Sequence, residues 1–272
     1  MRMKLPNLTP YGVGNILTLK VPVGLGAPTI DQIVFTLGGT LTRANIDWVK
    51  GLINGRIFYD ESAGAVAIAS KDQFHGTPLT ADQLVLDFTQ PDMRSSQEQL
   101  LTSLACSQFA DLTFQVKINA AAPAGGTIAA AMEYRPPTTN RNVLKRFAKG
   151  ENVTAAASAG VPFVLYVPSG KAGGKILRAW LFEGTAGAIT ALEMRSAGTT
   201  LWEGSRTELE DMCTRCFKVV QAGIVCIDFT LQGNLAGMLP TDAMPDIQLR
   251  LVTSSAVALN VVYEFVDPFD HL

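Results

Sequence analysis

A chain of 272 residues has room for two domains of roughly 130 residues, each large enough to bury a core of its own. Its 22 basic and 24 acidic residues leave a net charge of −2, which excludes the strongly basic surface of a general nucleic-acid-binding protein. Apolar residues make up 47% of the chain and charged residues 17%, a balance that suits either a large core or a surface buried in an obligate assembly.

The N-terminal residues carry positive charge at Arg2 and Lys4, but no apolar segment follows them, so no signal peptide is expected. No stretch of the chain approaches the roughly 18 uninterrupted apolar residues of a transmembrane helix. We therefore expect a protein that is made in a reducing cytosol. Its four cysteines are expected to be free thiols: Cys106, Cys213, Cys216 and Cys226.

The first half of the chain has a β pattern. Asn15–Val23 alternates apolar and polar residues, as a half-buried strand does. Asn54-Gly55 lies between two apolar runs and predicts a hairpin, because a type I′ turn needs positive φ at both central positions. Eight strands are predicted in this half: Asn15–Val23, Ile30–Leu37, Ile46–Ile53, Arg56–Tyr59, Ala65–Ala69, Leu84–Thr89, Leu112–Ile118 and Thr127–Tyr134.

Two helices are predicted beside these strands. Ser95 and Glu98 have the spacing of a capping box, and an apolar stripe from Leu100 to Ala105 follows them. After Arg135-Pro136-Pro137, a linker helix is expected with Asn140 as its cap, Arg141 to Lys149 as its body and Gly150 at its end.

The second half of the chain again has a β pattern. Its predicted strands are Phe163–Val167, Ile176–Phe182, Ile189–Met194, Thr199–Trp202, Phe217–Val220, Ile224–Thr230, Ile247–Val252 and Ala258–Phe265.

The two halves repeat each other. Ile30–Gly38 aligns with Ile176–Gly184 at an offset of 146 residues, and Met132–Tyr134 aligns with Tyr263–Phe265 at an offset of 131. Further matches keep the same order, and the offset only decreases, as it does for two copies of one fold when the second has shorter loops. Eight short strands in each copy, without alternating helices, predict an all-β protein of two sandwiches or barrels.

Few residues are suited to catalysis or metal binding. His271 is next to the C-terminal residue and His75 lies in a loop-like stretch, which argues against a histidine-based active site. Cys213 and Cys216 have a C-x2-C spacing without the second pair that structural zinc needs. An acidic cluster is interpreted as a solvated loop rather than a calcium site: Glu203, Glu208, Glu210 and Asp211. We expect no enzyme activity and no cofactor.

Several segments in order carry a resemblance to a known family. They are Met1-Arg2, Gly14-Asn15, Leu19–Gly24, Leu41–Ile46, Asn54-Gly55-Arg56, Gln90–Met93, Ile227–Gly233, Ile247–Leu251 and Val261–Glu264. The chain resembles the double-jelly-roll major capsid proteins of tailless icosahedral phages with an internal membrane, of the corticovirus and tectivirus type, and corticovirus is the nearer of the two. The resemblance implies two tandem eight-stranded jelly rolls, at residues 1–138 and 151–272, joined by the linker helix at 139–150.

The same resemblance implies a function and a set of partners. Three chains would form a trimer that presents six jelly rolls as a pseudo-hexagonal capsomer of an icosahedral shell around an internal membrane. The partners would then be further copies of the chain, the viral membrane, and penton and minor capsid proteins, with no direct contact to nucleic acid. Calcium accompanies some shells of this type, but no ligand set can be assigned here. The alternative is a two-domain carbohydrate-binding or bicupin-like protein with the same fold class.

A basic segment suggests which surface faces the membrane. Five basic residues and no acidic one lie between positions 135 and 150: Arg135, Arg141, Lys145, Arg146 and Lys149. Three of them recur every four residues and would form one stripe along the predicted helix. Basic residues near a helix C-terminus also stabilise its dipole, but the hypothesis drawn here is that these five face the anionic leaflet of the viral membrane.

Overall fold

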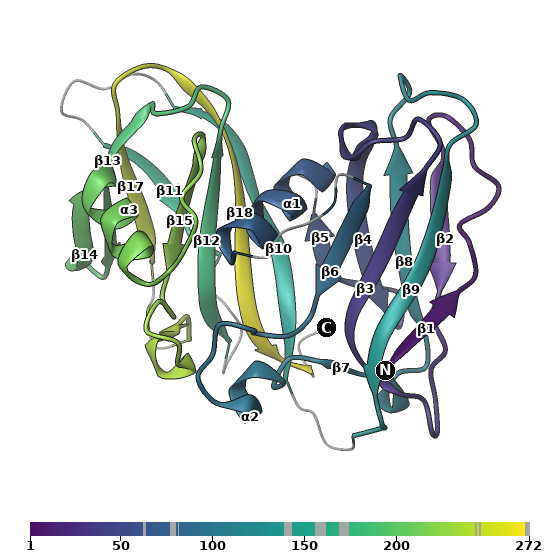
Figure 1. Ribbon diagram of the computed structural model, residues 1–272. Helices are drawn as coiled ribbons and strands as arrows, with labels where there is room; N and C mark the ends of the chain where they lie inside the picture. The colour runs from purple at the N-terminus through teal and green to yellow at the C-terminus, as the bar shows by residue number, and fades with distance from the viewer. Residues whose placement is uncertain are drawn as a thin grey trace. The chain divides into compact units, whose positions relative to one another are not determined.

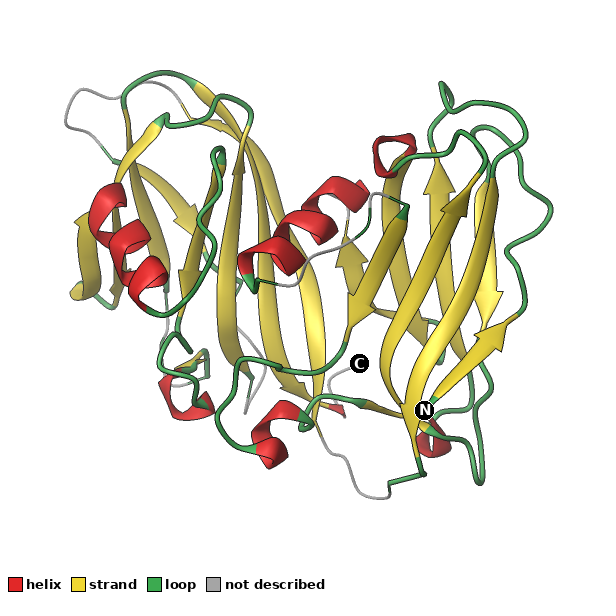
Figure 2. Cartoon of the chain, viewed as in Figure 1, coloured by secondary structure: helices red, strands yellow, loops and turns green. Residues whose placement is uncertain are grey.

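Two units make up the chain, and each is built from two β-sheets (Figure 1). The computed structural model describes residues 1–61, 64–76, 80, 82–138, 143–155, 162–168, 174–242, 244 and 246–269. The first unit comprises Met1–Gln73, Thr77–Ala148 and Pro268–Leu272, and the second comprises Phe74–Gly76 and Lys149–Asp267. The fold is mainly β, with few and short helices (Figure 2).

The first unit has two antiparallel sheets. One has the order β1 (Arg2–Leu5), β9 (Thr127–Arg135), β3 (Thr29–Gly38) and β6 (Gln83–Asp87), and the short β7 (Leu104–Ala105) also pairs with β3. The other has the order β5 (Arg56–Glu61), β4 (Ile46–Ile53), β8 (Leu112–Ile118) and β2 (Ile16–Lys20).

The second unit repeats this plan. One sheet has the order β10 (Val143–Ala155), β18 (Val257–Pro268), β12 (Lys175–Glu183) and β15 (Ile224–Asp228), and β16 (Leu239–Pro240) also pairs with β12. The residues of β10 up to Ala148 belong to the first unit, and those from Lys149 on belong to the second. The other has the order β14 (Thr199–Ser205), β13 (Ile189–Ser196), β17 (Gln248–Thr253) and β11 (Phe163–Tyr166). Each unit is therefore an eight-stranded jelly roll, as predicted.

In the described ranges, the strands are accompanied by the α-helices α1 (Gly64–Phe74), α2 (Ser96–Gln99) and α3 (Arg206–Arg215). The short 3-10 helices are η1 (Arg43–Asn45), η2 (Cys106–Gln108) and η3 (Leu235–Gly237). The predicted cap of α2 is confirmed, because the Ser95 hydroxyl accepts a hydrogen bond from the backbone N–H of Glu98 at 3.1 Å. The helix itself is shorter than predicted, since the apolar residues Leu104 and Ala105 pair with β3 instead.

Aromatic side chains fill the core of the first unit. Phe58 of β5, Phe114 of β8 and Phe88, just after β6, are fully buried, and their ring centroids lie 5.9 to 6.1 Å apart. They join the two sheets, because Phe88 follows a strand of one sheet and the other two rings come from the second. Burying each phenylalanine stabilises the unit by about 1.5–3 kcal/mol.

The hairpin between β4 and β5 turns at Asn54 and Gly55. Their φ angles of 51° and 78° are those of a type I′ turn, which confirms the prediction. The side chain of Asn54 also accepts hydrogen bonds from the backbone N–H groups of Ala110 and Asp111, at 2.9 and 3.0 Å. This asparagine therefore fixes the hairpin tip to the neighbouring loop as well as supplying the turn.

The chain returns to its first unit after β18. Phe269 stacks on Phe109, with ring centroids 5.4 Å apart and ring planes 18° from parallel. Two residues distant in sequence thus close one side of the same unit.

Two predicted strands are wrong. Ala65–Ala69 lies within α1, because a run of small and unbranched residues forms a helix at least as readily as a strand. Phe217–Val220 is not a strand but the segment that follows α3. The eighth strand of each jelly roll is instead β1 in the first unit and β10 in the second, and neither was predicted.

The predicted linker helix is also wrong. The described part of this segment is strand β10, with Phe147 opposite Tyr59 of β5 in the first unit. A spacing of four residues places side chains together on a helix, but it also places them on one face of a strand, whose side chains alternate with a period of two. The recurrence of basic residues could not distinguish the two structures.

The two units match residue by residue in their central strands. In β3, Gln32 lies opposite Asp87 and Glu133, and in β12, Arg178 lies opposite Asp228 and Glu264. Both strands have a bulge just before this residue, between Ile30 and Gln32 in one and between Ile176 and Arg178 in the other. The helices also correspond, since α1 follows β5 as α3 follows β14. The internal repeat in the sequence is therefore a duplicated fold.

Candidate functional site

A buried ionic cluster lies in the sheet of the second unit that contains β12, β15 and β18. The Arg178 guanidinium donates to Asp228 Oδ2 at 2.8 Å and to Glu264 Oε2 at 3.1 Å. All three side chains are at most 2% exposed. A third contact reaches the hydroxyl of Thr230 at 3.4 Å. Such a cluster is stable only when every charge has a partner, so Arg178 is a structural residue for this unit.

The equivalent position in the first unit is occupied by a neutral residue, Gln32. Gln32 donates to Asp87 Oδ2 at 2.9 Å, where Arg178 donates to Asp228 in the other copy. Each aspartate also accepts hydrogen bonds from the threonine two residues later, Thr89 or Thr230, through both its backbone N–H and its hydroxyl. The sequence repeat had aligned these segments, and the structure shows that they make the same local bonds.

The structure describes the side chains of three of the five basic residues predicted to face a membrane: Arg135, Lys145 and Arg146. Arg135 in β9 makes a bidentate ion pair with Asp31 and donates to the Ser103 hydroxyl at 2.9 Å. Lys145 is buried in β10, whereas the next residue, Arg146, is half-buried. Arg141 and the side chain of Lys149 lie outside the described residues. The structure thus assigns Arg135 and Lys145 to contacts within the first unit.

Lys145 belongs to a charged cluster around α1. Its ammonium group lies 5.2 Å from the centre of the Phe147 ring, and that of Lys71 lies 4.6 Å from the same ring. Lys71 also forms a buried ion pair with Glu61. These cation–π contacts hold two cations in the interior of the first unit.

Asp72 faces this cluster. Burial, and next the charge of Asp87, raise the pKa of Asp72 to about 8, while Lys145, Lys71 and Arg43 partly oppose the rise. In the described part of the chain, no group donates a hydrogen bond to its buried Oδ2. Asp72 therefore keeps its proton in the folded protein well above the pH at which an ordinary aspartate loses it.

The structure places most of the residues that were considered for catalysis or metal binding. His75 has its ring 6.2 Å from Trp180 and its Nδ1 3.3 Å from Lys218 Nζ, and His271 lies outside the described residues. The acidic cluster predicted as a loop lies at the end of β14 and in α3, where Ser205 and Glu208 form a capping box. Within the described ranges, no group of three histidine, cysteine or acidic side chains is placed to hold a metal ion.

The four cysteines are free thiols, as predicted. Burial raises the pKa of Cys106 to about 12 and is the main cause that raises the pKa of Cys213 to about 12. Both thiols therefore stay protonated at neutral pH and pack as small apolar groups. Cys216, at the end of α3, is half-buried.

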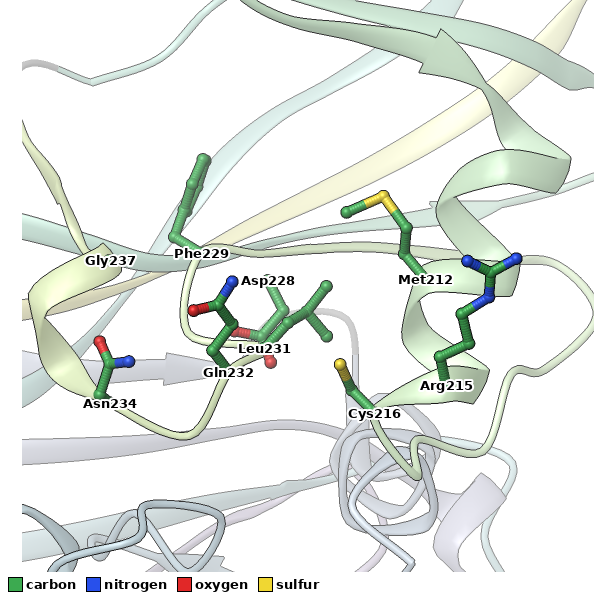
Figure 3. Close-up of a pocket in the computed structure, with 9 residues that line it drawn as sticks. All are labelled: Met212, Arg215, Cys216, Asp228, Phe229, Leu231, Gln232, Asn234 and Gly237. Carbon is green, nitrogen blue, oxygen red and sulfur yellow. The ribbon is translucent and has the colours of Figure 1, made fainter.

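An open pocket of about 420 Å³ lies beside the end of α3 (Figure 3). Met212 and Cys216 line it from α3, and Phe229 and Leu231 line it from the segment after β15. Its other lining residues are Arg215, Asp228, Gln232, Asn234 and Gly237. No sequence motif indicated this pocket, because its two walls come from segments that are brought together only by the fold.

Among the described helices, none has the length and apolar character to span a bilayer.

Solved capsid proteins share this fold. The major capsid protein P2 from bacteriophage PM2 is 18% identical, with a TM-score of 0.86 over 99% of this chain and 98% of that one. The capsid protein of Sulfolobus Turreted Icosahedral Virus is 14% identical, with a TM-score of 0.71 over 100% and 98%. The PBCV-1 virus capsid is 12% identical, with a TM-score of 0.63 over 97% and 92%. These likenesses establish the double-jelly-roll fold. No curated protein matches the chain in sequence.

Sequence models of one family match almost the whole chain. The viral coat protein P2 N-terminal domain matches residues 2–135, and the viral coat protein P2 C-terminal domain matches residues 147–269. The two matches fall on the two repeats. They favour a coat protein over the carbohydrate-binding or bicupin-like alternative. With family models matching both halves of its duplicated jelly roll, the chain belongs to the viral coat protein P2 family.

Proposed function

We propose that this major capsid protein forms homotrimers, and that each trimer is a pseudo-hexagonal capsomer of an icosahedral shell. The observation that carries the proposal is the duplication itself: the two units share strand order, bulge position and helix position. Three chains with two equivalent units each present six similar jelly rolls, and a closed cyclic trimer is a common symmetric arrangement for such a chain. The role is structural, without a catalytic step.

The trimer is tested by the mass of the released capsomer. Mass photometry or sedimentation of purified capsomers should give about three times the chain mass of 29.1 kDa, and this mass should persist on dilution. An obligate interface of that kind buries on the order of 2,000–5,000 Å². A stable monomer or dimer at micromolar concentration would contradict the proposal.

We further propose that the shell encloses an internal membrane and contacts penton and minor capsid proteins, with the protein made in the host cytoplasm and kept in the virion. Since Lys145 is buried, a membrane contact of the basic segment would rest on its other basic residues, among them Arg141, Arg146 and Lys149. Anionic lipid attracts each exposed basic residue by about 1 kcal/mol at low salt.

The membrane contact can be measured by flotation of capsomers with anionic liposomes at low and at physiological salt. We expect the triple substitution of Arg141, Arg146 and Lys149 by glutamine to reduce binding at low salt. Glutamine at Lys145 serves as the matched control, because this side chain is buried in the first unit. Equal binding by the triple variant and the wild type would reject this role for the segment.

A further inference from the structure

Phe217 is an exposed aromatic residue in an unfavourable backbone conformation. Its side chain is 93% exposed, and its φ of 61° lies in the left-handed region that phenylalanine rarely adopts. It is the second residue after α3, where its N–H donates to the carbonyl of Thr214 and the next N–H, of Lys218, donates to Cys213, both at 3.0 Å. This pair of bonds is a Schellman motif, whose left-handed position is usually glycine.

The duplicated fold supplies an internal comparison. The second residue after α1 is Gly76, with a φ of 74°. The first copy therefore has the residue that suits this position, and the second copy has a bulky apolar one with almost its whole side chain in solvent. Neither backbone conformation nor burial within the chain explains phenylalanine at 217.

The backbone around Phe217 is held firmly. Lys218 is buried, with its ammonium group 5.8 Å from the centre of the Phe74 ring, and the N–H of Val219 donates to the Phe74 carbonyl at 2.9 Å. The ring of Phe217 is thus presented outward from a fixed support, which limits the conformational entropy lost when a partner covers it.

The surroundings of Phe217 form one mixed surface. Met212 and Val219 are exposed apolar neighbours in sequence, at 43% and 41%. Cys216, the residue directly before Phe217 in the chain, lines the pocket of about 420 Å³ together with Met212. Ligand-binding clefts have volumes of roughly 300–1,000 Å³, and this pocket falls within that range. It therefore has room for an aromatic side chain.

Charge favours another copy of the chain as the occupant. The exposed side of α3 carries both an acid, Asp211, and a base, Arg215, one helical turn apart. A surface with both signs can pair with its own copy, whereas Glu208 and Asp211 would repel nucleic acid or an anionic membrane. Many copies of this chain meet in a shell, and aromatic residues in fitted pockets are the usual anchors of such contacts.

We propose that Phe217 is an assembly anchor that enters the pocket beside α3 of a neighbouring copy, an inference that rests on the proposed function. Phe217 directly follows the pocket residue Cys216 in the chain, so two copies that face each other can each place this ring in the pocket of the other. The contact joins capsomers, and its repetition around the shell multiplies a modest affinity into a stable lattice.

Phe217→Gly and Phe217→Asn test the anchor, because both residues tolerate a positive φ and both remove the ring. In a concentration series by sedimentation, we expect the association of capsomers to weaken roughly 10- to 150-fold per contact, as burial of one phenylalanine predicts. The mass of the capsomer should not change, and its melting temperature should stay equal or rise. Association at the wild-type level by either variant would overturn the proposal.

Tyr166→Asn is the matched control. Tyr166 is 68% exposed in β11 of the same unit, so this change also removes an exposed ring. We expect it to leave association unchanged. An equal loss in this control would assign the effect to exposed aromatic surface in general and would overturn a specific role for Phe217.

A photoreactive phenylalanine at position 217 tests where the ring goes. Capsomers from isotopically labelled and unlabelled chains are mixed before assembly and irradiation, and we expect cross-links between differently labelled chains, at the pocket residues between 212 and 237. Cross-links within one chain, or to another surface, would contradict the proposal. The capsomer mass tests the trimer separately, so a wrong stoichiometry and a wrong anchor give different results.

Discussion

Replacing Arg178 by alanine is expected to lower the free energy of unfolding by about 3–5 kcal/mol, because it leaves two buried carboxylates without their cation. Asp228 and Glu264 are at most 2% exposed and share the Arg178 guanidinium. The measurement is the shift of the guanidinium chloride midpoint for the second unit, at a pH near 7 where both carboxylates are ionised when unfolded.

The duplicated fold provides the control for this prediction. Gln32→Ala removes the equivalent side chain of the first unit, where the bond to Asp87 is between a neutral donor and a part-buried acid. We expect a loss of about 1–2 kcal/mol for that variant. Arg178→Gln, which places the residue of the first copy into the second, should fall between the two. If Arg178→Ala lowered the free energy of unfolding by less than Gln32→Ala does, the buried ionic cluster would not be a main stabilising contact of the second unit.

Asp72→Asn is expected to make the first unit less sensitive to pH and more stable at pH 8. The folded pKa of Asp72, about 8, lies above its value in the unfolded chain, so the folded state holds the proton more tightly. Its contribution to stability is therefore complete below about pH 4 and decreases as the pH rises to about 8, by up to about 1.4 kcal/mol per pH unit. Asparagine has the same shape and cannot ionise.

Thermal or chemical unfolding of both forms between pH 4 and 8 checks this prediction. The free energy of unfolding of the wild type should fall as the pH rises from 4 to 8. That of Asp72→Asn should change less with pH and should exceed the wild-type value at pH 8. The exposed Asp82→Asn is the control, since it removes a carboxylate from the surface of the same unit. Parallel profiles for Asp72→Asn and the wild type would contradict a proton held at this site.

Local patterns predicted the strands well where one face is buried and the other is not. In β8, apolar residues alternate as the sheet requires, and both β4 and β8 have the predicted bounds. The Asn54-Gly55 turn was predictable because its φ angles admit few other residue pairs. The repeat predicted the duplication, because the strand and turn residues are similar in kind and order in both halves.

The misassigned segments share a physical cause, which is that their patterns fit two structures. Ala65–Ala69 has small residues without a polar face, and only the position of α3 in the other repeat could have indicated a helix. The capping box of Ser205 and Glu208 was a usable signal for α3 that was not applied. The basic residues of β10 have a spacing that suits a helix and a strand alike.

The charged interior and the pocket were beyond the reach of sequence reasoning for a different reason. Arg178, Asp228 and Glu264 come from three strands, and only their register brings them together. Asp72 and Lys145 are similarly separated, and an isolated charge in a sequence gives no sign of burial. The alignment of Gln32 with Arg178 was available, but its meaning depends on the two acids that face each of them.

The stacking of Phe269 on Phe109 affects how the chain is made. Because this contact belongs to the first unit but needs residue 269, it cannot form while the ribosome is still adding the second unit. At elongation rates of roughly 5–20 residues per second, the delay between the two phenylalanines is on the order of ten seconds. A chain that ends before Phe269 would lack this stacking contact. The nascent first unit therefore stays incomplete until the second unit has been synthesised.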